Sequence, residues 1–268
     1  MLVFLGAMAE RRFSDAAFPI LVAHRGDPLR HPENSVEGFI SALRTGVDAV
    51  EFDVRLTRDA VPVIMHDADV SRTTDGRGLV HELTLAEIRR LNLAGTSRVP
   101  TLAEALEAVG SLGGGVDIEI KNLPGEPGFE AEAERTLEAT LSALRGARFA
   151  GSVVISSFNP ATIRRSVELA PDVATGLLII DAVDPFDALD AAIAEAHAFI
   201  LPSVASLADA GPALIGAAHE AGVRVGAWTA DDPGTVRRLL DWDVDAVATN
   251  RPALAAATRR AWQAEVGR

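Results

Sequence analysis

The stretch VEFDVRLTRDAVPVIMHD, residues 50–67, contains two strand-like runs with only the four residues Thr57 to Ala60 between them. Four residues leave no room for a helix, so we expect a hairpin-like connection here. Residues two apart in a strand lie on the same face. Glu51 and Asp53 therefore share one face of the first run, and the apolar residues that alternate with them occupy the other. The stretch predicts a strand that turns two carboxylates toward one side.

Outside this hairpin, strand-like and helix-like runs alternate along the chain without a Pro- or Ser-rich linker. This alternation is typical of βα units around a parallel sheet. We therefore expect an α/β fold, a TIM-type (β/α)8 barrel, with one strand more than eight because of the hairpin. The expected strands are Ile20 to His24, Ala49 to Val54, Val61 to Met65, Val116 to Lys121, Val153 to Ser156, Thr175 to Ile179, Ala198 to Leu201, Arg224 to Trp228 and Ala246 to Thr249.

We expect a single catalytic barrel domain over residues 20–256, since α/β barrels of about 250 residues are common as one domain. Residues 1–19 form an N-terminal segment in this division, and residues 257–268 form a helix end or tail. An insertion-like excursion at 67–100 is expected over the catalytic end of the barrel. Among the helices, the pattern predicts one over 129–144 and one over 208–221.

The composition excludes several classes of site. The chain has 268 residues and a net charge of −13, with no run of basic residues, so a nucleic-acid partner is not expected. It has no cysteine, which excludes disulfides and thiolate metal ligands. No apolar stretch is long enough for a membrane span. The apolar start at 1–9 lacks a positive region before it, so we expect no secretory signal and a cytoplasmic protein.

A third carboxylate follows the same alternation in IEIK, residues 118–121, where Glu119 and Lys121 share a face. Three carboxylates on inward strand faces are costly to bury unless a cation neutralises them. Oxygen donors without cysteine favour a hard ion. We therefore expect Glu51, Asp53 and Glu119 to hold one divalent cation, with Mg²⁺ or Ca²⁺ preferred and Mn²⁺ or Zn²⁺ as alternatives.

Two histidines, His24 and His66, stand at the ends of strand-like runs. Beside a metal site, such a pair can supply a general acid and a general base. Arg25 follows His24 directly, and its planar guanidinium matches two phosphate oxygens, while Gly26 allows the backbone to turn. Lys121 adds a second positive charge. These residues predict a site for an anionic tetrahedral ligand such as a phosphate.

Ten sequence blocks, in this order, resemble the glycerophosphodiester phosphodiesterase family. They are AHRGD (23–27), PENS (32–35), the stretch at 50–67, TTDGRG (73–78), LTLAEI (83–88), VPTLAEAL (99–106), IEIK (118–121), SSFNP (156–160), WTADDP (228–233) and ATNRP (248–252). The resemblance implies a phospholipase-C-like barrel with a divalent cation on the three carboxylates. It also implies His24 and His66 as the acid/base pair, Arg25 on the phosphate, and Lys121 close to the site.

For the substrate, the resemblance implies a small glycerophosphodiester that is hydrolysed to sn-glycerol 3-phosphate and an alcohol. Trp228 is expected to line the pocket, and Phe158 to contact substrate or to pack beside it. Which histidine is the acid, and which alcohol is preferred, stay open, as does the oligomeric state. The alternatives are lysophospholipase-D-type hydrolysis of lipid diesters, which an exposed apolar patch beside the mouth would favour, a noncatalytic binder of phosphorylated headgroups, and an enolate-forming lyase or isomerase with Lys121 as base.

Overall fold

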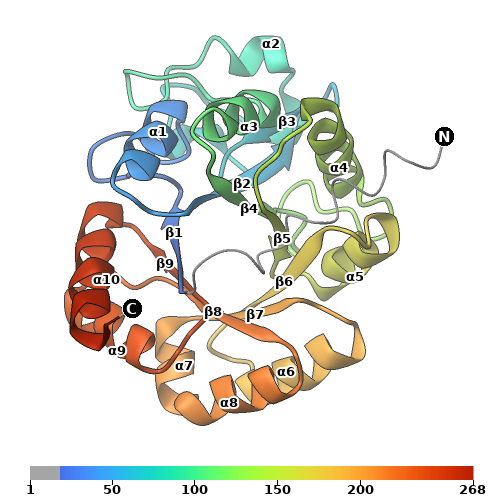
Figure 1. Ribbon diagram of the computed structural model, residues 1–268. Helices are drawn as coiled ribbons and strands as arrows, with labels where there is room; N and C mark the ends of the chain where they lie inside the picture. Colours follow the sequence, from blue (N-terminus) through green and yellow to red (C-terminus); the bar gives the residue numbers. More distant parts are fainter. Residues whose placement is uncertain (1–18, 268) are drawn as a thin grey trace, which may run out of the picture.

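The computed structural model describes residues 19–267, and a closed barrel of strands forms its centre, with helices around it (Figure 1). The strands are β1 (Ile20–His24), β2 (Ala49–Leu56), β3 (Pro62–Ile64), β4 (Gly115–Ile120), β5 (Val153–Ser157), β6 (Ala174–Ile179), β7 (Phe199–Pro202), β8 (Arg224–Ala227) and β9 (Ala246–Thr249). All except β3 are parallel to their neighbours, and pairing of β1 with both β2 and β9 closes the ring. The predicted TIM-type barrel is confirmed.

The strand β3 lies antiparallel to β2, with Val54 opposite Ile64. It stands outside the ring of eight, as the short connection at 57–60 predicts. The pairing brings the residues that follow β3 back over the end of the barrel where β2 and β4 finish. His66, which follows β3, therefore lies at the same end of the barrel as His24, which ends β1. In a simple βα repeat without this hairpin, the residues after β2 would lead into a helix on the outside of the barrel.

The helices cover the outside of the barrel. They are α1 (Val36–Arg44), α2 (Leu85–Ile88), α3 (Leu102–Gly110), α4 (Arg135–Ala147), α5 (Pro160–Leu169), α6 (Pro185–Ala194), α7 (Val204–Ala210), α8 (Pro212–Glu220), α9 (Pro233–Asp241) and α10 (Pro252–Val266). Local chemistry starts several of them. Thr101 and Glu104 form a capping box on α3, and Asn159 caps α5 directly before Pro160.

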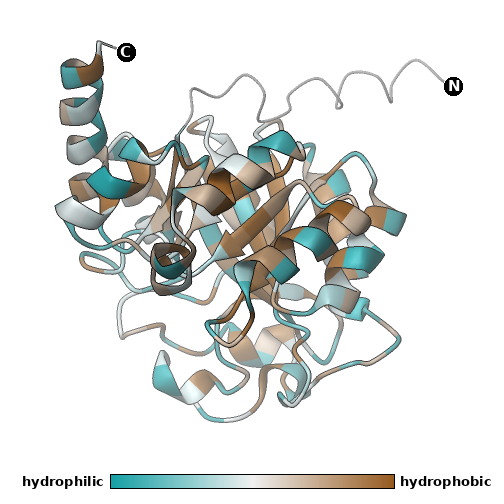
Figure 2. Ribbon diagram, turned by 90° about the horizontal axis from the view of Figure 1, so that it is seen from below, coloured by the Kyte–Doolittle hydropathy of each residue, from teal (hydrophilic) through white to brown (hydrophobic). Residues whose placement is uncertain are grey.

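The barrel has two apolar layers because successive strand residues face opposite ways. A larger core between strands and helices includes Phe52, Ile118 and Ile155. A smaller one inside the barrel includes Val22 and Leu201. Figure 2 shows the strands and the inward sides of the helices as hydrophobic, with hydrophilic residues on the outer helix surfaces. The outward apolar positions of β2 thus anchor the strand, and the alternate positions are left for the site.

The excursion at 67–100 has a small apolar core of its own. Val70, Val80, Ile88 and Val99 pack against Val63 of β3. Two short 3-10 turns, η2 (Val70–Arg72) and η3 (Val80–Glu82), and the helix α2 build it. Its first turn borders the catalytic end through Arg72, and its later part lies beside α1 and α3 (Figure 1).

Two expected helices differ from those observed. The helix expected over 129–144 begins only at Arg135, because Glu134 directly before it has a left-handed backbone conformation with a φ of 43°, which interrupts a right-handed helix. The helix expected over 208–221 is two helices, α7 and α8, since Gly211 at φ 70° and Pro212 start a new helix.

At the two ends, α10 runs continuously through the expected boundary at residue 256 and buries Trp262. The expected N-terminal segment lies outside the described residues, apart from residue 19. Within residues 19–267, no helix combines the length and the apolar character that crossing a bilayer would require.

Candidate active site

Three carboxylates meet at the end of the barrel where the parallel strands finish. Asp53 of β2 lies beside Glu119 of β4 in the register, and Glu51 lies one inward position earlier on β2. One oxygen of each of the three falls within 4.8 Å of the others, and all three residues are buried. The structure therefore brings together the three residues that sequence alternation singled out as metal ligands.

Two cationic side chains, Lys121 and Arg25, contact the carboxylates. Lys121 Nζ lies 2.6 Å from Glu119 Oε1 and 3.0 Å from Asp53 Oδ1. Arg25 Nε lies 3.3 Å from Asp53 Oδ2. A fourth carboxylate, the half-buried Asp117, is paired with Glu51 in the register and accepts a hydrogen bond from the hydroxyl of Ser156. Two cationic side chains thus face four carboxylates, three of them buried, which leaves an excess of negative charge.

The carboxylates respond to this excess in opposite ways. Burial, together with the nearby Asp53, raises the pKa of Glu51 well above its ordinary value. Burial raises the pKa of Glu119 to about 7, against the lowering effect of Lys121. Burial acts in the same upward sense on Asp53, but Lys121 and Arg25 overcome it and hold the pKa of Asp53 below its ordinary value. The cluster therefore favours proton uptake unless another cation is present.

The residues fit a hard divalent cation. Oε1 of Glu51 is buried and has no hydrogen-bond partner among the described residues, and Oδ1 of Asp53 has only the ion pair with Lys121. Uncompensated buried carboxylate oxygens are costly, and a cation would neutralise them. All donors are oxygens, which suits Mg²⁺, Ca²⁺ or Mn²⁺.

The chain leaves β1 through a strained turn that points Arg25 at this cluster. Arg25 has a positive φ of 55°, and its backbone N–H donates to Glu51 Oε2 at 2.8 Å. Gly26 follows at φ 90°, where a Cβ would lie 2.9 Å from the carbonyl carbon of Gly38 in α1. Glycine is therefore required here by both conformation and space. The tight turn at Arg25 and Gly26 packs against α1, and this turn places the Arg25 guanidinium beside the carboxylates.

A second residue of the same connection was missed as a site residue. As the residue before a helix, Asn34 is of a type that commonly caps helices, but the cap of α1 is Ser35. Asn34 instead has a φ of 58°, and its amide donates to Asp53 Oδ2 at 2.8 Å. Next to it, Glu33 accepts hydrogen bonds from Arg72 and Arg25, which places Glu33 at the rim of the site. In the sequence, only the resemblance of the PENS motif at 32–35 to the family drew attention to these residues.

The two histidines lie at the same end of the barrel with different partners. Nδ1 of His24 lies 2.8 Å from Oδ1 of Asn250, whose amide Nδ2 donates to Asp231. Nδ1 of His66 lies 2.6 Å from Oδ1 of Asp67. Burial, followed by the charge of Arg25, lowers the pKa of His24. Burial also lowers the pKa of His66, although Asp53 and Asp67 act against it.

An aromatic wall completes the pocket. The rings of Phe158 and Trp228 meet edge to face with centroids 5.4 Å apart. They line a cavity of about 190 Å³ together with both histidines, Arg25 and Lys121. The indole N–H of Trp228 donates to the carbonyl of Leu201, which fixes the orientation of the ring. The structure places all nine candidate site residues in or directly beside one cavity, since Asp53 is bonded to Arg25 and Lys121.

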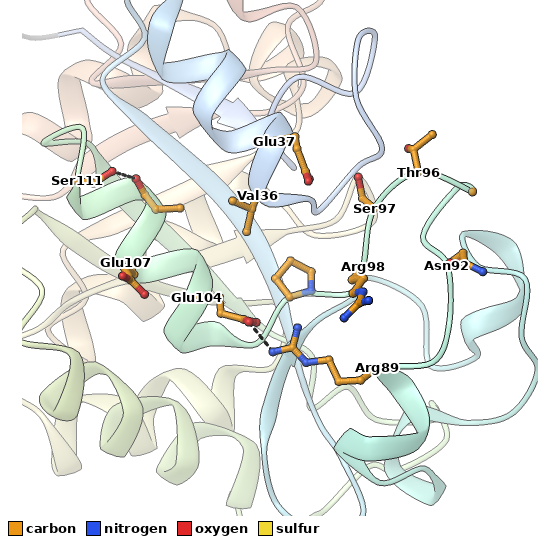
Figure 3. Close-up of a pocket in the computed structure, with 13 residues that line it drawn as sticks. Val36, Glu37, Arg89, Asn92, Thr96, Ser97, Arg98, Glu104, Glu107 and Ser111 are labelled. Carbon is orange, nitrogen blue, oxygen red and sulfur yellow. Dashed lines mark hydrogen bonds and ion pairs between the residues drawn. The ribbon is translucent and has the colours of Figure 1, made fainter.

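A larger hollow of about 710 Å³ lies on the outside of the barrel between α1, α3 and the excursion (Figure 3). It contains no histidine, and Arg89 at its edge is paired with Glu104 of α3. Its polar groups stand apart around a wide opening, without a metal-binding cluster. The chemistry therefore belongs to the smaller cavity inside the barrel.

Comparison with known proteins gives consistent results. Residues 24–254 match the sequence profile described as the Glycerophosphoryl diester phosphodiesterase family. A glycerophosphodiester phosphodiesterase of Caldanaerobacter subterraneus subsp. tengcongensis is 34% identical over 244 residues, covering 87% of this chain and 94% of the relative. A probable glycerophosphodiester phosphodiesterase 2 of Mycobacterium tuberculosis is 31% identical and covers 87% of each chain.

Solved structures agree in fold. An Oleispira antarctica phosphodiesterase, determined in complex with the product sn-glycerol-3-phosphate, has a TM-score of 0.81 and 28% identity. The match covers 90% of this chain and 97% of that one. A Silicibacter pomeroyi protein described as a putative glycerophosphoryl diester phosphodiesterase has a TM-score of 0.80 and 27% identity. The barrel and its connections are thus shared over nearly the whole described chain.

The raised pKa of Glu119 predicts a pH-dependent effect of Glu119→Gln on the metal-free protein. A carboxyl group with a folded-state pKa of about 7 stabilises the fold below its unfolded pKa, and this contribution is lost as the pH rises through the folded value. The neutral amide does not titrate. We expect the variant to gain free energy of unfolding relative to wild type as the pH rises from about 5 to 7.

Urea unfolding in EDTA across this range measures the difference between the two proteins, so that titration of the histidines cancels. Glu107→Gln, at an exposed position of α3, is the matched control and should show no such trend. A difference between Glu119→Gln and wild type that stays constant with pH would contradict the electrostatic description of the cluster.

Proposed function

The chain belongs to the glycerophosphoryl diester phosphodiesterase family, a family of hydrolases, and on this basis we propose that it hydrolyses glycerophosphodiesters to sn-glycerol 3-phosphate and an alcohol, with a divalent cation and the pair His24 and His66. The observation that carries the proposal is the convergence of an acidic triad, two histidines and two cations on one cavity. None of the three features alone specifies phosphodiester cleavage, but together they supply charge, base and acid around a phosphate.

The metal is proposed to be held by Glu51, Asp53 and Glu119. When bound, a divalent cation would polarise a non-bridging phosphate oxygen as a Lewis acid and so favour attack at phosphorus. Arg25 and Lys121 are proposed to hold the remaining phosphate charge. The pKa of each is raised, because the neighbouring carboxylates outweigh the effect of burial. Both side chains therefore stay cationic at neutral pH.

His24 is proposed as the general base. Asp231 can only accept hydrogen bonds when ionised, so it binds the N–H₂ of Asn250 and leaves the amide oxygen for His24. This oxygen requires a proton on Nδ1 of His24, and the neutral ring then has its free lone pair at Nε2. The lowered pKa keeps the ring neutral. Nε2 can therefore take the proton of the attacking group, which we propose is the glycerol 2-hydroxyl.

His66 is proposed as the general acid. Its Nδ1 is bonded to a carboxylate, Asp67, which stabilises the protonated ring. Nε2 can then donate a proton to the oxygen of the departing alcohol. The attack forms a bond from the glycerol O2 to phosphorus while the bond to the alcohol oxygen breaks, which gives a cyclic phosphate. Water opens this ring in a second step, with the two histidines in exchanged roles.

The lyase alternative from the sequence is disfavoured by Lys121. A base must lose its proton, but the pKa of Lys121 is raised by Asp53 and Glu119, which it contacts directly. The noncatalytic alternative is disfavoured because every acid/base and metal-binding candidate is retained in one cavity.

A second candidate function, hydrolysis of lysophospholipids, is favoured by one surface feature. Leu178 of β6 lines the pocket, and Ile180, which lies two residues further along the same face, is 52% exposed. Val183 and Phe186, at the start of α6, are each 41% exposed. This apolar rim, residues 180, 183 and 186, continues the pocket wall outward in the direction that an acyl chain on the glycerol would take.

Removal of the metal should abolish activity. We expect EDTA to suppress release of glycerol 3-phosphate from glycerophosphocholine by at least about 100-fold, since the Lewis acid supplies several kcal/mol. Adding back Mg²⁺, Ca²⁺, Mn²⁺ or Zn²⁺ in turn should restore turnover with at least one ion. The Glu51→Gln variant should not regain turnover with any of these ions. Full turnover in EDTA by folded protein would contradict the proposal.

Replacement of the histidines should separate their roles. We expect His24→Ala and His66→Ala each to lower kcat by about 10² to 10⁴ on glycerophosphocholine. A p-nitrophenyl ester of glycerol 3-phosphate needs no protonated leaving group, so it should restore much of the rate of His66→Ala but not of His24→Ala. His219→Ala, at the opposite end of the barrel where α8 finishes, should keep the wild-type kcat. Activity that survives both single replacements would refute the assignment.

For the lipid candidate, the ratio of kcat/KM for lysophosphatidylcholine to that for glycerophosphocholine is decisive. If the apolar rim binds an acyl chain, Phe186→Ser should lower this ratio by about three- to tenfold, because the variant loses the apolar contact of one large side chain with the acyl chain. Ile193→Ser, an exposed apolar residue at the far end of α6, is the control. An unchanged ratio in Phe186→Ser would remove the lipid candidate.

A further inference from the structure

A second cavity of about 200 Å³ adjoins the active site and shares one wall residue with it. Lys121 lines both cavities. The second cavity lies beyond Lys121, between the end of β2, the turn η3 and the segment that connects β4 to α4. Arg55 follows Asp53 on the inward face of β2 and stands beside Lys121, because Val54 and Ile120 are paired in the register. The two cavities therefore meet at Lys121.

The wall of this second cavity is rich in cationic side chains. Four cationic side chains line it, Arg55, Arg58, Lys121 and Arg135, with Glu130 as its one carboxylate. This is unusual for a chain with a net charge of −13. The active-site pocket differs, since aromatic and aliphatic side chains form much of its lining. The two cavities therefore suit two chemically different parts of one substrate.

The arginines are held in place without being saturated. Arg55 is buried and donates to Glu126 Oε2 at 2.6 Å. Arg58 is paired with Glu87, which lies outside the cavity wall, and Arg135 is paired with Glu130. A guanidinium has five N–H donors, and one carboxylate uses only part of them. Each of the three arginines lines the cavity and has N–H donors beyond those that its carboxylate partner uses.

Given the proposed role of His66 as general acid, the cavity also lies on the side from which the alcohol departs. Nε of Arg55 donates to the backbone carbonyl of His66 at 2.8 Å, so one side chain links the cavity wall to the proposed general acid. The oxygen that His66 protonates belongs to the leaving alcohol, and the alcohol must therefore be on this side of the phosphate. The aromatic wall of Phe158 and Trp228 is left for the glycerol.

We propose that this cavity binds the leaving alcohol and selects glycerophosphodiesters whose alcohol has a negatively charged group, such as a carboxylate. The inference rests on the proposed phosphodiesterase function and deepens it. The overall charge of the protein repels an anionic substrate, so a preference of this kind requires a local source of positive charge. Arg58 and Arg135, both at the open side of the cavity, are the specificity-determining residues.

Glycerophosphoserine and glycerophosphoethanolamine test the proposal as a matched pair, because their alcohols differ only by one carboxylate. The measured quantity is the ratio of their kcat/KM values with saturating metal. In wild type we expect glycerophosphoserine to be preferred by about two- to fivefold for each partly exposed arginine that contacts the carboxylate. Arg135→Ala and Arg58→Ala should each lower the ratio, and the double variant should bring it to one or below.

Arg165→Ala is the matched control, because Arg165 of α5 is also exposed and ion-paired but lies outside the cavity. It should keep the wild-type ratio. A wild-type ratio of one or below, or a ratio that Arg135→Ala and Arg58→Ala leave unchanged, would overturn the proposal while turnover of glycerophosphoethanolamine upholds the phosphodiesterase function. No turnover of either substrate would refute the function, and the alcohol site with it.

Discussion

Four carboxylates, three of them buried and one half-buried, lie at one end of the barrel against two cationic side chains, and the surrounding structure responds to this constraint. Glu51, Asp53, Asp117 and Glu119 come from neighbouring strands whose other faces are anchored in the apolar core. Such a cluster is unfavourable in isolation, because burial removes the water that would solvate the charges. Protons, Lys121 and Arg25 offset part of this cost, and a divalent cation would offset the rest.

The fold supplies this arrangement through register and through strain. Parallel pairing of β2 and β4 sets Asp53 beside Glu119, and the hairpin to β3 returns His66 to the same end. The β1 connection places Arg25 and Asn34 at positive φ, each with a hydrogen bond to a carboxylate of the cluster. Strained backbone is retained where surrounding contacts hold it, and here the contacts belong to the site.

The sequence was most informative where a short-range rule operates. Strand alternation predicted that Glu51 and Asp53 share a face, and the four-residue gap at 57–60 predicted the extra antiparallel strand. It was least informative about partners that only folding brings together. Asn250 and His24 are separated by 226 positions, and no local pattern marks their hydrogen bond. The predicted helix boundaries were wrong at Glu134 and at Gly211, where a positive φ overrides an apolar pattern.

The central claim is that a divalent cation completes the charge of the carboxylate cluster, and calorimetric titration of Mn²⁺ into metal-free protein tests it directly. The account predicts one ion bound for each chain at about pH 6.5, with release of protons from the carboxylates whose pKa is raised, and loss of this binding in Glu51→Gln. Absence of saturable binding, or equal binding by wild type and Glu51→Gln, would contradict it.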